Sequence, residues 1–177
     1  STQYETLPTQ VPIQKRSEIY ADRTEVVEQR YPAAGQANVA IRLGVVSPRG
    51  GDARWLDLGA NPDSYLARVD WADGKRLAFQ VQSRDQRRLD LIEADLHSGK
   101  QRTLLSEHAE AFLNLHDNLR FLPDGGFVWS SERSGFRHLY LHDRDGKLVR
   151  QLTSGDWVVE KVQAVDEAGG KVYFTAT

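Results

Sequence analysis

The chain has 177 residues, 40% hydrophobic and 27% charged, a balance typical of one folded globular domain and unlike that of a disordered chain. Its 23 basic and 25 acidic side chains give a formal net charge of −2, so we expect no nucleic-acid partner. The absence of cysteine excludes disulfides, thiolate metal sites and cysteine nucleophiles within these residues.

No apolar run approaches the roughly 20 residues that a membrane-spanning helix needs, so we expect no membrane partner. Methionine is absent, including from position 1. We therefore expect the chain to be a mature or excised part of a longer protein, and the compartment is left open by these features.

The first predicted element is a β-hairpin within residues 11–35, which we call the arm. Its strands are predicted near Lys15–Tyr20 and Glu25–Arg30, around a turn at Ala21–Thr24. The outward charges indicate that the arm projects from the body of the domain.

A repeated pattern fills the rest of the chain. Residues 36–60 resemble the second half of a repeat, 61–106 and 107–157 are two complete repeats, and 158–177 begin another. Asp73-Gly74 matches Asp124-Gly125 at an offset of 51, and Leu89 matches Leu139 at an offset of 50. The period is therefore near fifty residues.

Each complete repeat contains four short strands separated by polar or glycine turns. In the first and second repeat, respectively, these are a lead-in strand (Ala67–Trp71; Asn118–Leu122), an alternating strand (Leu77, Phe79, Val81; Phe127, Trp129), a third strand (Leu89, Leu91; Leu139, Leu141) and an edge strand (Gln101–Leu105; Leu148–Thr153).

Four short antiparallel strands per fifty residues are typical of a β-propeller blade. A β-sandwich would also contain short strands, but it has no reason to repeat its turn chemistry at this period. We predict that residues 1–177 are an all-β partial β-propeller of about three blades, too few to close a ring.

The stretch at 107–117 lacks alternation and is predicted to form a helical turn or a long loop between blades. Irregular insertions in repeat arrays commonly line a binding face, so we select Phe112, Asn114 and His116 as candidate substrate-binding residues. The equivalent turns QSRDQRR and SERSGFR lie at one end of such a ring, where their Arg and Glu side chains line a rim, face a partner domain or are simply solvated.

No Gly-x-Ser-x-Gly motif surrounds Ser130, Ser131 or Ser134, and no phosphate-binding glycine loop is present. We therefore predict no catalytic residue in this segment and no cofactor.

His138 and His142 point to one face of a strand, as two metal ligands would, but no third ligand is evident. The alternative is that His138 hydrogen-bonds the adjacent turn and His142 lies on the surface. Asp90, Glu93 and Asp95 resemble a carboxylate cluster, yet charges on an outer strand are usually solvated. We predict no metal site.

Three stretches resemble the N-terminal propeller of the dipeptidyl peptidase IV family, in particular its bacterial forms: RYPAAGQANVAIRLGVV (30–46), YLARVDW (65–71) and LRFLPDGGFVWSSERSGFRHLYLHDRDGKLVRQLTSGDW (119–157). The resemblance implies a serine exopeptidase that removes dipeptides with proline or alanine in second position. It also implies an eight-bladed propeller over an α/β-hydrolase domain that carries the catalytic Ser, Asp and His. The compartment implied is the periplasm, with secretion as the alternative.

This chain departs from that family pattern in two respects. It contains neither the hydrolase domain nor the glutamate pair that binds the substrate's amino terminus, a pair which precedes the region matching Pro8–Arg16. In the loop matching Leu113–His116, mammalian members carry an aromatic-Arg pair where this chain has Asn114 and Leu115, so that role is not transferred.

The arm matches an extension that helps mammalian relatives to dimerise. The resemblance therefore implies a homodimer contact through Ile19, Tyr20, Asp22, Arg23, Glu25 and Val27.

The favoured function is a propeller segment that scaffolds and gates a peptidase whose catalytic groups lie elsewhere in the protein. One alternative is a propeller-like interaction module with no enzymatic role. Another is a different prolyl-oligopeptidase branch, such as a tripeptidyl or acylaminoacyl peptidase.

Overall fold

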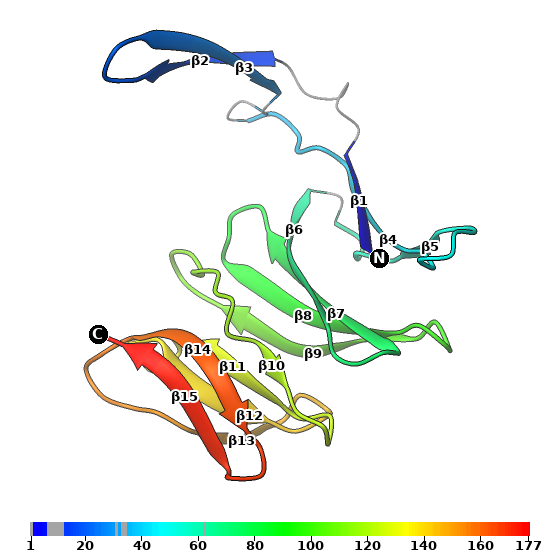
Figure 1. Ribbon diagram of the computed structural model, residues 1–177, viewed down its shortest axis with the longest axis vertical. Helices are drawn as coiled ribbons and strands as arrows, with labels where there is room; N and C mark the ends of the chain where they lie inside the picture. Colours follow the sequence, from blue (N-terminus) through cyan, green and yellow to red (C-terminus); the bar gives the residue numbers. More distant parts are fainter. Residues whose placement is uncertain (1, 7–12, 31, 33–34, 62) are drawn as a thin grey trace. The chain divides into compact units, whose positions relative to one another are not determined.

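The computed structural model describes residues 2–6, 13–30, 32, 35–61 and 63–177. The chain divides into two compact units, residues 1–66 and 67–177. Every regular element of the described residues is a β-strand (Figure 1). Among the described residues there is no helix that is long and apolar enough to cross a membrane.

The first unit contains a three-stranded antiparallel sheet and the arm. Its strands are β1 (Thr2–Thr6), β2 (Ile13–Ile19), β3 (Thr24–Arg30), β4 (Ile41–Val45) and β5 (Arg54–Leu56). The sheet order is β1-β4-β5, so the arm, formed by β2 and β3, is inserted between two paired strands. The sequence predicted only residues 36–60 of this sheet, because the polar stretch of β1 gives no alternating apolar signal.

The second unit contains three successive sheets, and β6 begins at the end of the first unit. Its strands are β6 (Ser64–Trp71), β7 (Arg76–Ser83), β8 (Arg88–Asp95), β9 (Gln101–His108), β10 (Arg120–Phe121), β11 (Phe127–Ser131), β12 (His138–His142), β13 (Leu148–Gln151), β14 (Val159–Asp166) and β15 (Lys171–Ala176).

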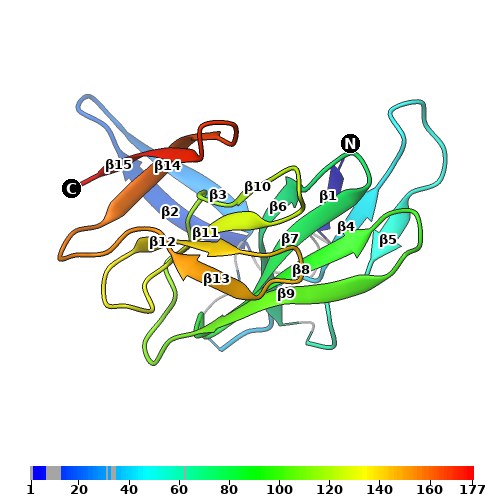
Figure 2. The ribbon, with the colours of Figure 1, turned by 90° about the horizontal axis from the view of Figure 1, so that it is seen from below.

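These strands pair with their chain neighbours to give the sheets β6–β9, β10–β13 and β14–β15. Figures 1 and 2 both show the three sheets following one another along the chain, with the middle sheet between the other two. A two-layer sandwich has no such succession of four-stranded sheets. The predicted all-β partial propeller is therefore confirmed, with no closed ring of sheets among the described residues.

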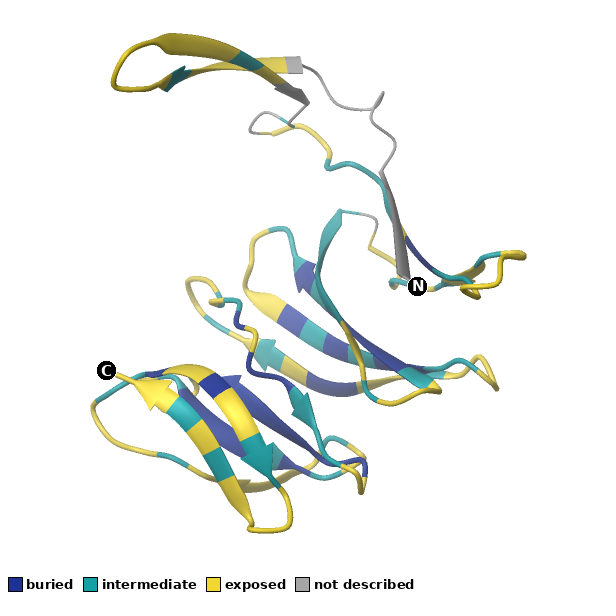
Figure 3. Ribbon diagram, in the orientation of Figure 1, coloured by how far each residue is buried: buried dark blue, intermediate teal, exposed yellow. Residues whose placement is uncertain are grey.

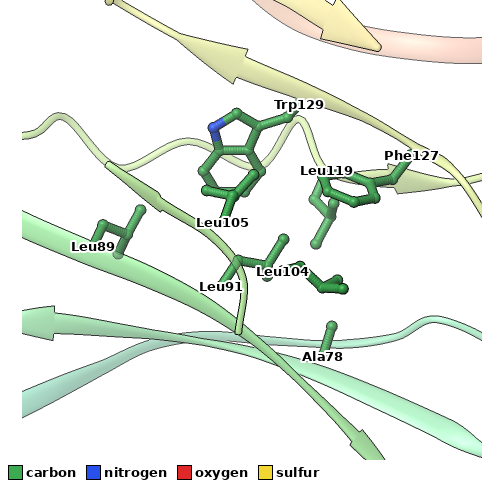
Figure 4. Close-up of a cluster of buried hydrophobic side chains, with 8 residues drawn as sticks. All are labelled: Ala78, Leu89, Leu91, Leu104, Leu105, Leu119, Phe127 and Trp129. Atoms are coloured by element: carbon green, nitrogen blue, oxygen red, sulfur yellow. The ribbon is translucent and has the colours of Figure 1, made fainter. Parts of the chain in front are cut away.

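The core between sheets β6–β9 and β10–β13 is apolar. Ala78 of β7, together with leucines of β8 and β9, packs against Phe127 and Trp129 of β11 (Figure 4). Leu77 and Phe79 are also fully buried but lie outside this cluster. The apolar-polar alternation of the sequence selected Leu77 and Phe79 as the inward residues of β7. It therefore missed Ala78, which is the β7 residue in this core.

The strand β11 is buried along its whole length (Figure 3). Phe127 and Trp129 face the preceding sheet, whereas Val128 packs with Val159 and Val162 of β14. A strand covered on both faces cannot show the apolar-polar alternation of a half-exposed strand.

The turn between β12 and β13 lies directly against β9 of the preceding sheet. Gly146 has a φ of +84°, and a Cβ at this position would collide with the carbonyl of Leu104. Glycine is therefore required both for the left-handed backbone and for the close approach.

Glu93 holds an arginine that links the same two sheets beside the β12–β13 turn. Its side chain is 7% exposed and accepts hydrogen bonds at 2.9 Å from both Arg76 and Arg102. The Arg102 guanidinium also forms an ion pair with Asp145 of the next sheet, with 2.5 Å between Nη1 and Oδ1. The expectation that Glu93 is solvated is wrong, because a carboxylate with two arginine partners can be buried.

Asn118 joins the last two sheets. It is 1% exposed, and its amide donates to Ser130 Oγ at 2.9 Å and to the Glu160 carbonyl at 3.3 Å. Its carbonyl oxygen accepts the Val162 N–H at 2.8 Å. One buried amide therefore satisfies polar groups of β11 and β14 at once.

We predict that Asn118→Ala lowers the free energy of unfolding by about 2 kcal/mol or more, because it leaves buried partners on two strands unpaired. Urea unfolding at pH 7 measures this change. The control is Asn114→Ala, which removes an exposed amide and should change the same free energy by less than about 0.5 kcal/mol. Equal effects for the two variants would contradict the assignment.

Candidate functional site

The candidate site is the connection from β9 to β10, which is an irregular loop with no helical turn. Its path is fixed by the turn between β7 and β8. The Ala109 N–H donates to the Arg87 carbonyl at 2.9 Å, and the Leu113 N–H donates to the Gln86 carbonyl at 2.7 Å. The loop is therefore held by the backbone and not only by side chains.

Asn114 lies at the outer side of this loop. Its side-chain amide donates to both carboxylate oxygens of Glu132, at 3.1 and 2.9 Å. Glu132 belongs to the turn between β11 and β12, the SERSGFR turn of the sequence. The structure thus brings the candidate loop together with both turns that the sequence placed at the same end, QSRDQRR through the Gln86 and Arg87 carbonyls and SERSGFR through Glu132.

A pocket of about 350 Å³ opens between the loop and this turn. Phe112 lines it and is 57% exposed, so its ring is available for contact. The other lining residues are Ser106, Glu107, His108, Ala109, Leu113, Glu132 and Arg133. The pocket combines an apolar wall with polar and charged groups, as ligand pockets in proteins generally do.

Glu107 organises the inner wall of the pocket. Its carboxylate accepts hydrogen bonds from Trp129 Nε1 at 3.1 Å, Ser131 Oγ at 3.0 Å and Arg133 at 2.6 Å. Arg133 also lies 4.6 Å from the centre of the Tyr140 ring. The sequence did not single out Glu107, since a lone glutamate at the end of an edge strand carries no recognisable signal.

His116 does not reach the pocket surface. It is 8% exposed, and its ring meets Trp129 edge-on at a centroid distance of 4.4 Å. Its Nδ1 accepts the Asn118 N–H at 3.3 Å, and the ring also hydrogen-bonds the Ser130 backbone. We therefore assign His116 to the core and retain Phe112 and Asn114 as the exposed members of the candidate set.

Burial of His116 disfavours its charged form and lowers its pKa to about 4. Neighbouring Glu107 and Asp117 oppose this shift only in part. The imidazole is therefore neutral at physiological pH, as a packed and hydrogen-bonded core residue should be.

The two histidines of β12 make structural hydrogen bonds. His138 contacts Thr153 Oγ1 at 3.1 Å and the Gly155 carbonyl at 2.9 Å. His142 contacts the Gly146 carbonyl at 2.8 Å and stacks on Phe127. The expectation that His142 lies on the surface is wrong: it is 3% exposed, because the next turn folds over it.

The carboxylates of β8 also have local partners. Asp90 accepts from Arg88 at 2.9 Å and from Ser106, while Asp95 accepts the N–H groups of His97 and Ser98. Within the described part of the chain, no three of the His, Asp and Glu side chains are grouped as metal ligands would be.

The three serines considered as nucleophiles are hydrogen-bonded within the fold. Ser130 accepts from Asn118, Ser131 donates to Glu107, and Ser134 accepts from the Tyr140 hydroxyl at 2.9 Å. None of these contacts is with a histidine, the general base of a serine-hydrolase triad.

Both faces of the arm carry apolar and charged side chains: the face of Ile19 and Val26 also carries the Lys15–Glu28 ion pair, at 2.9 Å, and Val27 lies on the other face. Ile19 and Val26 share one face and are 83% and 65% exposed. The opposite face carries Glu18 paired with Arg16 at 2.6 Å, and Glu25 paired with Arg23 at 2.6 Å. Figure 3 shows the arm as exposed along nearly all of its described length. Its projection from the body stays a prediction.

Comparison with known proteins identifies the relatives of this chain. Residues 4–177 match the family described as the dipeptidyl peptidase IV (DPP IV) N-terminal region. The crystal structure of Porphyromonas gingivalis dipeptidyl peptidase 4 superposes with a TM-score of 0.84 at 27% identity, covering 99% of this chain and 25% of that one.

Two sequence relatives show the functional range of these proteins. Venom dipeptidyl peptidase 4 of Vespa velutina is 25% identical, over 85% of this chain and 21% of that protein. Inactive dipeptidyl peptidase 10 of Mus musculus is 29% identical, over 83% of this chain and 20% of that protein. The chain therefore spans about a fifth to a quarter of the length of these relatives.

We predict that the stability of the fold decreases as the pH falls from about 6.5 to about 4, because the unfolded chain protonates position 116 while the folded chain excludes the proton. Between pH 7.5 and 4.5 this single group should cost about 2 to 3 kcal/mol. Urea unfolding of wild type and His116→Gln across this range tests it.

The stability difference between wild type and His116→Gln should shrink on acidification, since the variant lacks the titrating group. His97→Gln, which removes an exposed histidine from a turn, serves as the control and should keep the wild-type pH slope. A pH slope in His116→Gln equal to that of wild type would rule out the assignment.

Proposed function

The chain belongs to the dipeptidyl peptidase IV N-terminal region family, and from this premise we propose that it is the propeller part of a serine exopeptidase. The enzyme would release N-terminal dipeptides with proline or alanine in second position. Its catalytic Ser, His and Asp would lie in an α/β-hydrolase domain outside these residues. The observation that carries the proposal is the match of nearly the whole chain to this family and to a dipeptidyl peptidase structure.

In this proposal the segment scaffolds and gates the active site. The loop between β9 and β10, held by the β7–β8 turn and by Glu132, supplies a fixed surface, and Phe112 and Asn114 stand at its exposed side. An aromatic ring beside carboxylates suits contact with a peptide, which offers both apolar and cationic groups. We therefore propose that this pocket contacts the substrate.

A non-enzymatic propeller module is the second candidate. One specific observation favours it, namely that a relative of similar identity carries the name inactive dipeptidyl peptidase 10. The two candidates differ in whether the full-length protein hydrolyses dipeptide substrates.

We also propose that the arm mediates a homodimer and that the protein is periplasmic. Support for the dimer comes from the two exposed aliphatic side chains on one arm face, since unpaired strands with exposed apolar groups favour association. The proposal centres the contact on Ile19 and Val26, with the turn residues Tyr20, Asp22 and Arg23 at its border. Glu25 and Val27, which the resemblance also implies, lie on the opposite face of the arm.

We predict that the full-length protein hydrolyses Gly-Pro and Ala-Pro chromogenic substrates and that residues 1–177 alone do not. In the full-length protein, Phe112→Ala should raise KM about three- to tenfold with kcat nearly unchanged, because the ring contributes binding but no chemistry. Steady-state kinetics with a longer Pro-containing peptide measure the effect.

Phe136→Ala provides the matched control, because Phe136 is 40% exposed in the neighbouring turn but does not line the pocket. The same KM for Phe112→Ala and wild type would exclude the pocket contact. A full-length protein without any hydrolysis would exclude the enzymatic proposal and favour the module.

We predict that Ile19→Asp combined with Val26→Asp converts the full-length dimer to monomer, because two charges would be buried in the contact. Sedimentation velocity at micromolar concentration measures this. Gln14→Asp, an exposed position on the other arm face, should leave the dimer intact. An unchanged sedimentation coefficient in the double variant would exclude the arm as the interface.

A further inference from the structure

A narrow cavity adjoins the candidate pocket and shares Glu107, Leu113 and Glu132 with it. Asn114 of the β9–β10 loop and Arg137, the residue before β12, also line this cavity. The space open to the centre of a water molecule is about 10 Å³. One water molecule fits such a space, whereas a side chain or an organic ligand does not.

Arg137 carries an unpaired donor at this cavity. Its Nε is buried and has no hydrogen-bond partner among the residues that the structure describes. Within the same part of the chain, no carboxylate forms an ion pair with its guanidinium. A buried donor without an acceptor destabilises a fold, so this N–H requires a partner that the neighbouring side chains do not supply.

Glu132 is the acceptor with spare capacity in this cavity. Among the described residues, its two carboxylate oxygens accept hydrogen bonds only from the Asn114 amide, at 3.1 and 2.9 Å. A carboxylate can accept about four hydrogen bonds. Glu107, the other carboxylate of the cavity, already accepts from three side chains, so Glu132 is the better partner for a further donor.

The pairing of β11 with β12 brings Glu132 and Arg137 close together. Ser131 pairs with His138 at the end of this ladder, so Glu132 and Arg137 are the next residues on the two sides of the turn. Residues that face each other across antiparallel strands have Cβ atoms about 4.5 to 5.5 Å apart. A single water molecule can therefore contact both side chains.

We propose that one water molecule occupies this cavity, accepts the Arg137 Nε–H and donates to the Glu132 carboxylate. Because Glu132 also holds Asn114, the water completes a chain of polar contacts from the β11–β12 hairpin to the β9–β10 loop. Arg137 is thus a positioning residue of the candidate pocket, although it does not line the pocket itself. The inference concerns how the pocket is held and does not depend on the proposed peptidase activity.

A crystal structure of the full-length protein, at a resolution that shows ordered water, tests the proposal directly. It should place a water oxygen within about 3.2 Å of both Arg137 Nε and a Glu132 carboxylate oxygen. A direct ion pair between Arg137 and Glu132 would overturn the proposal. So would a group from another part of the protein bound to Arg137 Nε, or a water molecule that contacts Arg137 alone.

Hydrogen exchange of the full-length protein tests the positioning role in solution. Arg137→Met keeps most of the aliphatic stem and removes the guanidinium. Exchange of the loop amides around Leu113, whose own N–H donates to the Gln86 carbonyl, should become at least about threefold faster, because the loop loses one support. Arg150→Met, which removes an exposed arginine from β13, is the control and should keep the wild-type exchange rate.

The same measurement in an Asn114→Ala background separates this role from a general loss of packing. Arg137→Met should add no further acceleration there, because the chain of contacts is already broken at Asn114. Equal acceleration in both backgrounds would show that Arg137 acts on the loop by another route and would overturn the proposal. An unchanged exchange rate in Arg137→Met alone would overturn it as well.

Discussion

Within residues 67–177, each sheet buries an apolar face against the sheet beside it, so its burial depends on that neighbour. The constraint is clearest in β11, where Phe127 and Trp129 complete the core of the preceding sheet while Val128 completes that of the following one. Apolar contacts occupy the middle of each interface. Polar groups lie at both ends of the interface between sheets β6–β9 and β10–β13. Glu93 and its two arginines lie at the end beside the β12–β13 turn. Glu107 lies at the other end with its donors Trp129, Ser131 and Arg133. Burying a carboxylate costs desolvation energy, which these paired donors offset.

This interface geometry also forms the candidate site. The end marked by Glu107 carries the β9–β10 loop and the β11–β12 turn, which meet through Asn114 and Glu132. The same contacts that align two sheets therefore hold a pocket with an exposed aromatic ring beside it. Backbone hydrogen bonds and the Asn114–Glu132 contact therefore hold the walls of this pocket in place.

The repeat period and the turn residues were enough to predict the fold. Asp-Gly pairs at 73–74 and 124–125 mark equivalent turns, and the leucines of β8 and β12 mark equivalent strands, because turn dihedrals and core faces restrict residue choice locally. Burial in this fold depends on the neighbouring sheet, and sequence alternation does not report it. For that reason Ala78 was missed, His142 was placed on the surface and Glu93 was expected to be solvated. His116 could not be separated from the exposed Phe112 and Asn114, since an irregular loop has no periodicity that distinguishes inward from outward side chains.

The insertion of the arm between β1 and β4 shows that some connections between strands tolerate added residues and others do not. In the complete four-stranded sheets, the short turns β7–β8 and β11–β12 are equivalent to the connection from β1 to β4. The connection between the second and third strands therefore accepts either a few residues or a whole hairpin, because its flanking strands remain paired in both cases. The β12–β13 turn, with Gly146 against the Leu104 carbonyl, has no such latitude. For protein engineering, a graft in the β7–β8 or β11–β12 turn should leave adjacent sheets packed but disturb the β9–β10 loop that these turns hold, whereas a graft at the β12–β13 turn would separate adjacent sheets.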